Sequence, residues 1–220
     1  MPQYDRERVS RLFDDVVGAS GSTGKEATSH GPTIPQIAGQ VAFERLELRP
    51  EDVLLDVGTG TGDMAIAAAR ICRKLIGIDV SRRSLEQART KAALESLNNM
   101  VLAYGAFEDP CAEVDLAAHG ITKILAVYSL HHLPDEMKRQ SLTGLAGLLS
   151  RRGRMAIGDI MFFDDPDKHR EEFDEAAYDA GDTDFPARAE YLSDCLQQIG
   201  GGVHVVQIHP LVGVIVADFP

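Results

Sequence analysis

A glycine-rich turn between two short apolar runs is the feature of this sequence with the clearest chemical meaning. It reads Asp56-Val-Gly-Thr-Gly-Thr-Gly-Asp63, and it comes directly after the apolar run Val53–Val57. Glycines in such a turn let the chain change direction sharply and let a ligand lie against bare backbone. The next apolar run ends at Asp79, whose carboxylate can accept hydrogen bonds from both hydroxyls of a ribose. The spacing therefore predicts a ligand that contains a nucleoside.

Two adjacent histidines, His131 and His132, come just after a later apolar run, where a substrate would meet such a ligand. An imidazole has a pKa near neutrality, so either side chain suits the work of a general base. The same side chains would equally serve to fix the loop by hydrogen bonding, or to pack against a cofactor. The sequence leaves these roles open.

Positioning these residues requires a regular framework, and the apolar pattern supplies one. Short apolar runs of the buried-strand type alternate with segments of helical spacing. The runs cover 53–57, 75–79, 101–104, 124–128 and 155–157, and the helical segments cover 64–73, 84–97 and 135–150. Parallel strands need crossover helices, and strands covered on both faces are continuously apolar. The pattern predicts an α/β fold with a mainly parallel sheet and helices on both faces.

The end of the chain has a different pattern. A helix predicted over 187–199 stops at three glycines, and strands follow over 203–208 and 212–216. The three residues between these strands are too few for a crossover helix, so the strands should form an antiparallel hairpin.

Two further segments flank this framework. An N-terminal helix with Val9, Leu12 and Phe13 on one side precedes residues 18–35, which are rich in Gly, Ser and Thr. This composition predicts a mobile loop, and we expect residues 1–37 to form a lid over a single domain spanning 1–220. Residues 164–185 are strongly acidic, with a helix expected around 169–177.

The composition disfavours several classes of binding partner. The net charge of −12 disfavours a nucleic-acid acceptor. Three widely spaced cysteines form neither a disulfide framework nor a zinc motif. We find no signal peptide and no membrane span, and expect a cytoplasmic location without membrane partners. Asp159, Asp164 and Asp165 follow the fifth strand, where carboxylates can hold Mg²⁺, but such a run is more often a solvated loop, so no metal is expected.

The combination of Asp56-x-Gly58-x-Gly60-x-Gly62 with Asp79 resembles the first two motifs of the class I S-adenosylmethionine-dependent methyltransferases. The likeness runs from about residue 38 to 218. The segment 128–134, Tyr-Ser-Leu-His-His-Leu-Pro, is similar to a His-His-Leu signature common in small-molecule members of bacterial type. The resemblance implies a Rossmann-like, seven-stranded sheet with a C-terminal antiparallel hairpin. It also implies S-adenosylmethionine as cofactor, S-adenosylhomocysteine as product, and a small-molecule methyl acceptor.

The same resemblance assigns residues to the cofactor. The backbone of the glycine turn would hold the methionine part, Asp56 would lie beneath it, and Asp79 would hold the ribose. Members often carry an acid after the glycine that follows the third strand; here Gly105-Ala106-Phe107 stands instead, leaving Glu108 or Asp109 for the adenine amino group. The residues assigned to the cofactor are Asp56, Gly58, Thr59, Gly60, Gly62, Asp79, Val80, Ala106, Phe107 and Tyr128.

Two other functions fit the same motifs. One is a cofactor-binding regulatory protein without catalysis, and the other is an NAD-dependent oxidoreductase, whose ribose-binding acid also follows a glycine turn. No Asn/Asp-Pro-Pro-Tyr segment follows the fourth strand, which disfavours methylation of adenine in DNA. The acceptor, the methylated atom and the oligomeric state are not determined by the sequence.

Overall fold

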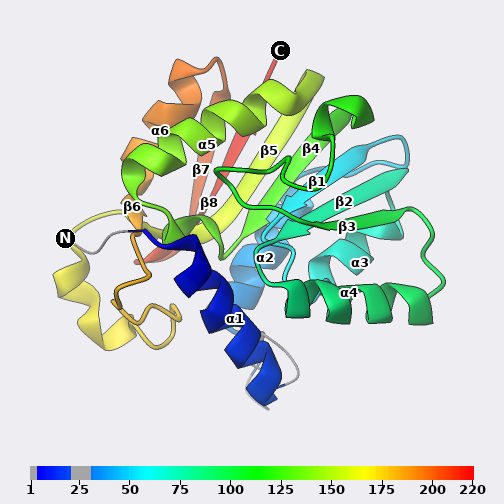
Figure 1. Cartoon of the computed structure of the whole chain (residues 1–220). Coiled ribbons are helices and arrows are strands. Elements are labelled where there is room, and N and C mark those ends of the chain that lie inside the picture. The colour runs from blue at the N-terminus through cyan, green and yellow to red at the C-terminus, as the bar shows by residue number, and fades with distance from the viewer. Residues whose placement is uncertain (1–3, 21–30) are drawn as a thin grey trace.

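The computed structural model describes residues 4–20 and 31–220, and its centre is a twisted sheet (Figure 1). Seven strands lie in the order β3-β2-β1-β4-β5-β8-β7, and a two-residue strand, β6 (Ala187–Arg188), pairs with β5 outside this path. The strands on the path are β3 (Met100–Tyr104), β2 (Lys74–Asp79), β1 (Val53–Val57), β4 (Ile121–Val127), β5 (Leu149–Phe162), β8 (Val212–Asp218) and β7 (Gly202–His209). The expected Rossmann-like sheet of seven strands is confirmed, with β6 as an addition.

Strand direction divides the sheet as the sequence predicted. The neighbours β3, β2, β1, β4 and β5 are parallel, whereas β8 is antiparallel to both β5 and β7. The C-terminal hairpin is therefore confirmed. Strand β5 is much longer than the three apolar residues expected, because it pairs with β4 on one side and β8 on the other.

Helices cover both faces of the sheet, and strand residues alternate between them. Leu54 of β1 packs in a cluster with α2 and α3, whereas Val53 and Leu55 pack in a cluster with α5 and α6. Figure 1 shows α5 and α6 together on one side of the strands. The helices are α1 (Arg6–Ser20), α2 (Ile34–Arg45), α3 (Asp63–Ala69), α4 (Arg82–Leu94), α5 (Asp135–Leu148) and α6 (Ala189–Gln198). Burial on both faces explains the continuously apolar strands.

Helix α2 was not expected from the sequence. It begins within the segment predicted to be a mobile loop, of which residues 21–30 lie outside the described part of the chain. The Thr33 side chain accepts a hydrogen bond from the backbone of Gln36, whose side chain accepts from the Thr33 backbone in return. Pro35 stands in the first turn. This capping box is a sequence-readable helix start that the Gly, Ser and Thr content of the segment concealed.

The acidic segment after β5 also differs from expectation. Instead of an α-helix around 169–177, the chain forms a short 3-10 helix, η3 (Pro166–Glu172), followed by turns. His169 has non-helical backbone angles, which interrupts regular helical hydrogen bonding. The expected α-helix is therefore wrong, and the segment runs as an irregular strap beside α1 at one end of the sheet (Figure 1). None of the described helices has the length and apolar character needed to cross a membrane.

Candidate functional site

The glycine turn connects β1 to α3 in a conformation that side chains resist. Gly58, Gly60 and Gly62 have φ angles of +77°, +54° and +86°. The backbone N–H groups of Gly58 and Thr59 both donate to the Ile78 carbonyl, at 2.9 and 3.0 Å, so the turn is held against β2. A Cβ atom on Gly58 would lie 2.5 Å from the Ser129 Cβ, which leaves no room for a side chain there.

Two carboxylates accept hydrogen bonds from this turn. Asp79 accepts from the backbone N–H of Gly60 at 2.7 Å through one oxygen, and from that of Ser81 at 2.8 Å through the other. Asp56 is buried and accepts from the Thr59 hydroxyl at 2.7 Å. Burial raises the pKa of Asp56 to about 6, which the Thr59 hydrogen bond partly opposes. Both acids therefore shape the loop that the sequence assigned to the cofactor.

A cavity of about 920 Å³ opens where β1, β2 and β4 end. Its lining brings together most of the predicted site residues: Gly58, Gly60, Asp79, Val80, Ala106, Phe107, Tyr128, His131 and His132. Asp56, Thr59 and Gly62 do not line it. Gly62 instead faces α4, where an added Cβ would lie 2.8 Å from the Ala88 Cβ, so this glycine serves helix packing.

Glu108 lines the cavity beside Phe107, at the place where the family acid was missing from the sequence. Its Oε1 accepts from the Tyr4 hydroxyl at 2.8 Å and from Arg6 Nε at 2.6 Å. Its Oε2 is buried and has no hydrogen-bond partner among the described residues. Such an atom is costly unless a donor reaches it, and a nucleobase amino group is a donor of the right kind. Asp109 also pairs with Arg6, at 3.3 Å, but it does not line the cavity.

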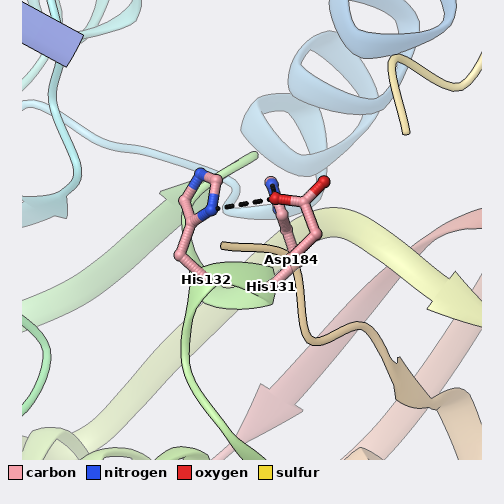
Figure 2. A group of neighbouring side chains, drawn as sticks. All are labelled: His131, His132 and Asp184. Atoms are coloured by element: carbon pink, nitrogen blue, oxygen red, sulfur yellow. Dashed lines mark ion pairs between the residues drawn. The ribbon is translucent and has the colours of Figure 1, made fainter. Parts of the chain in front are cut away.

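The two histidines lie together on the short 3-10 helix η2 (Leu130–His132) after β4, and both are buried. Figure 2 shows them with Asp184, which belongs to the acidic segment 164–185, called the acidic strap from here on. His131 Nδ1 donates to Asp159 Oδ1 at 2.5 Å, while its Nε2 lies 3.8 Å from Asp184 Oδ1. His132 Nδ1 lies 3.0 Å from the Thr183 carbonyl and 3.2 Å from Asp184 Oδ1. The tautomer of His131 is thereby fixed, with its Nε2 left toward the cavity.

Asp159 is the residue that orients His131. It stands within β5, and its second oxygen accepts from the backbone N–H groups of Ser129 and Leu130 at 3.1 and 2.7 Å. Burial by itself raises the pKa of Asp159, but the neighbouring His131 lowers it by a larger amount. The net pKa is therefore below the usual value of an aspartate. A carboxylate with these partners remains ionised. Asp159 therefore holds the loop that carries the two histidines. Asp164, the next acid singled out in the sequence, lies elsewhere and pairs with His169 at 2.8 Å.

The charges around His131 set its basicity. Burial lowers its pKa, but the carboxylates Asp159 and Asp184 raise it by more, so the net pKa is above that of an ordinary histidine. Burial likewise raises the pKa of Asp184, and the two histidines bring it below its usual value. His131 thus lies between two anions, an arrangement that stabilises the imidazolium formed when it takes a proton.

The acidic strap is tied to the histidine loop, by which we mean residues 128–134, through two sets of hydrogen bonds. The Phe185 N–H donates to the His131 carbonyl at 2.7 Å. The fully buried Lys138 donates to the carbonyls of Leu133 and Phe185. Asp184 and Lys138 were missed from the sequence because nothing local marks them. Asp159 had a signal, since a lone acid in a buried strand needs a partner.

Residues 54–153 match a family described as a methyltransferase domain. This segment is therefore similar to methyltransferase domains, which supports the resemblance to S-adenosylmethionine-dependent methyltransferases seen in the sequence. Its glycine turn, Asp79 and Glu108 fit the nucleoside of that cofactor, because they offer bare backbone, an acid at a strand end and a buried acceptor with no partner among the described residues. The match favours this cofactor over NAD.

Relatives of the methyltransferase domain act on acceptors of different kinds. The chain is 32% identical to the 27-O-demethylrifamycin SV methyltransferase of Amycolatopsis mediterranei over 55% of its own length and 43% of the relative. It is 34% identical to the ribosomal protein L11 methyltransferase of Lactobacillus gasseri over 61% and 39%. The chain thus spans about two fifths of these curated relatives.

The solved structure of magnesium protoporphyrin IX methyltransferase from Synechocystis PCC 6803, which holds S-adenosylhomocysteine, has the same fold. Its TM-score to the chain is 0.68 at 16% identity, over 98% of this chain and all of that one. At this identity the likeness concerns the fold, so the acceptor must be inferred from the site of this chain itself.

Proposed function

We propose that the protein methylates a small-molecule acceptor beside His131, with His131 as general base and Asp159 as its positioning residue. The observation that carries this proposal is the fixed imidazole: Nδ1 is held by Asp159 at 2.5 Å, while Nε2 is turned to the cavity. A base that must remove a proton in the transition state needs that kind of fixed tautomer.

S-Adenosylmethionine, when bound, supplies a methyl group on a positively charged sulfur, and the neutral thioether formed by the transfer is a good leaving group. The residues of the chain do the rest. The glycine turn and Asp79 would hold the nucleoside and methionine parts, and fixing the cofactor in this way favours transfer to an acceptor held beside it. The Glu108 Oε2 would accept a hydrogen bond from the adenine amino group. Val80, Ala106, Phe107 and Tyr128 form walls that exclude water from the reacting atoms.

His132 has a second role in this proposal. Its Nδ1 already faces the Thr183 carbonyl and Asp184, and its ring packs edge-on against Phe13 of α1 at 5.2 Å between centroids. These contacts join α1, the histidine loop and the acidic strap. We therefore assign His132 to holding the acceptor end of the cavity together rather than to proton transfer.

The N-terminal region contributes a cover to the site. Helix α1 is fixed near the end of β2, since Ser10 donates to the Val80 carbonyl at 2.8 Å and Ser81 donates to Asp14 at 2.6 Å. Val9 and Phe13 line the cavity from this helix. We propose that residues 1–37 act as the lid expected from the sequence, so bound S-adenosylhomocysteine should protect residues 18–35 from proteolysis. Equal cleavage with and without this ligand would contradict the lid.

A small molecule is favoured over a protein or RNA acceptor by the position of His131. The side chain is 6% exposed and lies inside a cavity, where a compact ligand fits and a folded macromolecule does not reach without insertion. The net charge of −12 further disfavours RNA.

The test is a calorimetric titration of the purified protein with S-adenosylmethionine, S-adenosylhomocysteine and NAD, followed by an acceptor screen that measures formation of S-adenosylhomocysteine. Binding of the two sulfur nucleosides but not NAD, with turnover that depends on acceptor, is expected. Binding of the cofactor without turnover by any acceptor would favour the non-catalytic regulatory protein. Binding of NAD alone, or of none of the three, would contradict the proposal.

A further inference from the structure

The cavity has room for a second ligand besides the cofactor. Its volume of about 920 Å³ is near the upper end of the roughly 300–1,000 Å³ typical of single small-molecule sites. The cofactor residues Gly58, Asp79 and Phe107 lie toward one end. The histidine loop, α2 and the acidic strap enclose the other end, which we call the acceptor end. Helix α1 borders both ends, because Ser10 donates to the Val80 carbonyl and Phe13 packs against His132.

Apolar side chains of α1 and α2 form one wall of the cavity, and this wall reaches the acceptor end where Phe13 packs against His132. Val9, Leu12, Phe13 and Val16 lie on one face of α1 at helical spacing and all line the cavity, and Ile34 and Pro35 add to this wall from α2. Leu12 remains 41% exposed although it lies on this apolar face. An apolar ligand that covers this wall would remove its surface from water, which is favourable in proportion to the area covered.

Apart from the two histidines, the ionisable side chains with a full charge that line the cavity are all acidic among the described residues. Among the described lining residues there are six carboxylates and no lysine or arginine: Asp79, Glu108, Asp174, Glu175, Asp179 and Asp184. Arg6 pairs with Glu108, and Asp79 is bound by backbone N–H groups, so the cofactor end is balanced. Among the described residues that line the acceptor end, the two histidines are the ones able to carry positive charge, and both already face carboxylates. Behind this lining, His209 Nε2 lies 3.9 Å from Glu175.

Asp179 and Asp184 bring two of these carboxylates close to each other. Burial raises the pKa of Asp179, and the neighbouring Asp184 raises it further, which is the behaviour of like charges that share a site. The Asp184 side chain is only 6% exposed, whereas Asp179 is exposed. An anionic group placed beside Asp184 would add a further negative charge where screening by solvent is reduced. The strap therefore selects against anions.

We propose that the methyl acceptor is a lipophilic molecule without an anionic group, which lies on the apolar face of α1 with its reacting atom at His131 Nε2. This assignment rests on the proposed function. It excludes phosphorylated and carboxylated acceptors, and it admits neutral alcohols, phenols and protonated amines.

The test compares three probes that share one apolar ring system and differ in charge: 2-(2-naphthyl)ethanol, 2-(2-naphthyl)ethylamine and 2-naphthylacetate. Each is titrated by calorimetry into the protein saturated with S-adenosylhomocysteine, at pH 7.5 and low salt. The alcohol and the protonated amine should bind, and the acetate should bind at least about tenfold more weakly. Added salt should narrow the difference, because it screens the carboxylates.

Two variants assign the effect to the acceptor end. The double substitution Glu175→Gln with Asp179→Asn should strengthen binding of the acetate several-fold and leave the alcohol unchanged. Glu190→Gln is the matched control, because Glu190 is an exposed acid on α6 that does not line the cavity.

Equal or tighter binding of the acetate would overturn the charge selection. Failure of all three probes in protein that binds S-adenosylhomocysteine would overturn the lipophilic acceptor. Failure to bind S-adenosylhomocysteine itself would instead count against the proposed function, so the two failures are distinguishable.

Discussion

The two ends of the cavity are built in different ways. The cofactor end is made mainly of backbone, since Gly58 and Gly60 present bare main chain, and Asp79 is fixed by main-chain N–H groups. The acceptor end is made of side chains from α1, α2, η2 and the strap, which are far apart in sequence. Backbone serves one constant ligand, whereas side chains can be exchanged without disturbing the sheet. The comparison indicates that cofactor binding is the less adaptable property and acceptor choice the more adaptable one.

The largest effect is expected at the acceptor end, from His131→Ala. Loss of a general base lowers kcat by about 10²–10⁴-fold. Binding of S-adenosylhomocysteine should change little, because the variant leaves the glycine turn and Asp79 intact. Steady-state kinetics with an acceptor from the screen, together with calorimetry, measure both quantities. His204→Ala is the matched control, because His204 is an exposed residue of β7. Unchanged kcat in folded His131→Ala would eliminate His131 as the base.

Asp79→Ala tests the cofactor end. The change removes hydrogen bonds that a charged group accepts, each worth about 1.5–3 kcal/mol, so S-adenosylhomocysteine should bind about 10–100-fold more weakly. Asp63→Ala is the control, because Asp63 also belongs to the glycine turn but is exposed and pairs with Lys91. Calorimetry gives the dissociation constant of S-adenosylhomocysteine for both variants and for the wild type. Similar losses in both variants would mean that Asp79 has no special part in holding the cofactor.

Gly62→Ala separates packing from binding within the glycine turn. A Cβ at this position meets Ala88 at 2.8 Å, and the φ of +86° disfavours any side chain. Overpacking of this kind lowers the free energy of unfolding by about 1–3 kcal/mol. Urea denaturation of both proteins gives this quantity.

The matched control for Gly62 is Gly147→Ala. Gly147 lies in α5 with no atom within 4 Å of an added Cβ, and alanine there should stabilise the helix by up to about 1 kcal/mol. If Gly62→Ala were as stable as the wild type, or if it lost cofactor affinity while keeping its stability, the packing role of Gly62 would be wrong.

The smallest effect concerns pH and Asp184. A general base must be neutral, so kcat falls as the pH drops through the pKa of His131, and the two carboxylates place that acid limb above 6.5, the ordinary histidine value. Asp184→Asn removes one carboxylate, lowers the pKa of His131 and shifts the limb to lower pH, with only a several-fold change in the plateau. Asp182→Asn, an exposed neighbour paired with Arg8, should leave the pH profile in place. A limb that moves upward in Asp184→Asn would contradict this sign.

Much of the framework was predictable because local rules govern it. The apolar runs predicted β1 to β4 to within a few residues, and the short gap after β7 forced the terminal hairpin. The length of β5 was not predictable, since it depends on partners on both sides. The 3-10 helix η3 differs from the expected α-helix because tertiary contacts, such as the Tyr128 hydroxyl donating to the Ala176 carbonyl, override weak local propensity.

The sequence by itself determined the cofactor end. Its glycines and Asp79 lie within 22 residues of one another, counting from Gly58 to Asp79, and a turn followed by a helix imposes their arrangement. The tertiary structure alone decided the acceptor end. His131, Asp159 and Asp184 are separated by 28 and 25 residues, as their numbers give, and only the pairing of β4 with β5 and the path of the strap bring them into contact. Side chains that meet through long-range packing leave no periodic trace in the sequence, and for that reason the partners of His131 emerged only in three dimensions.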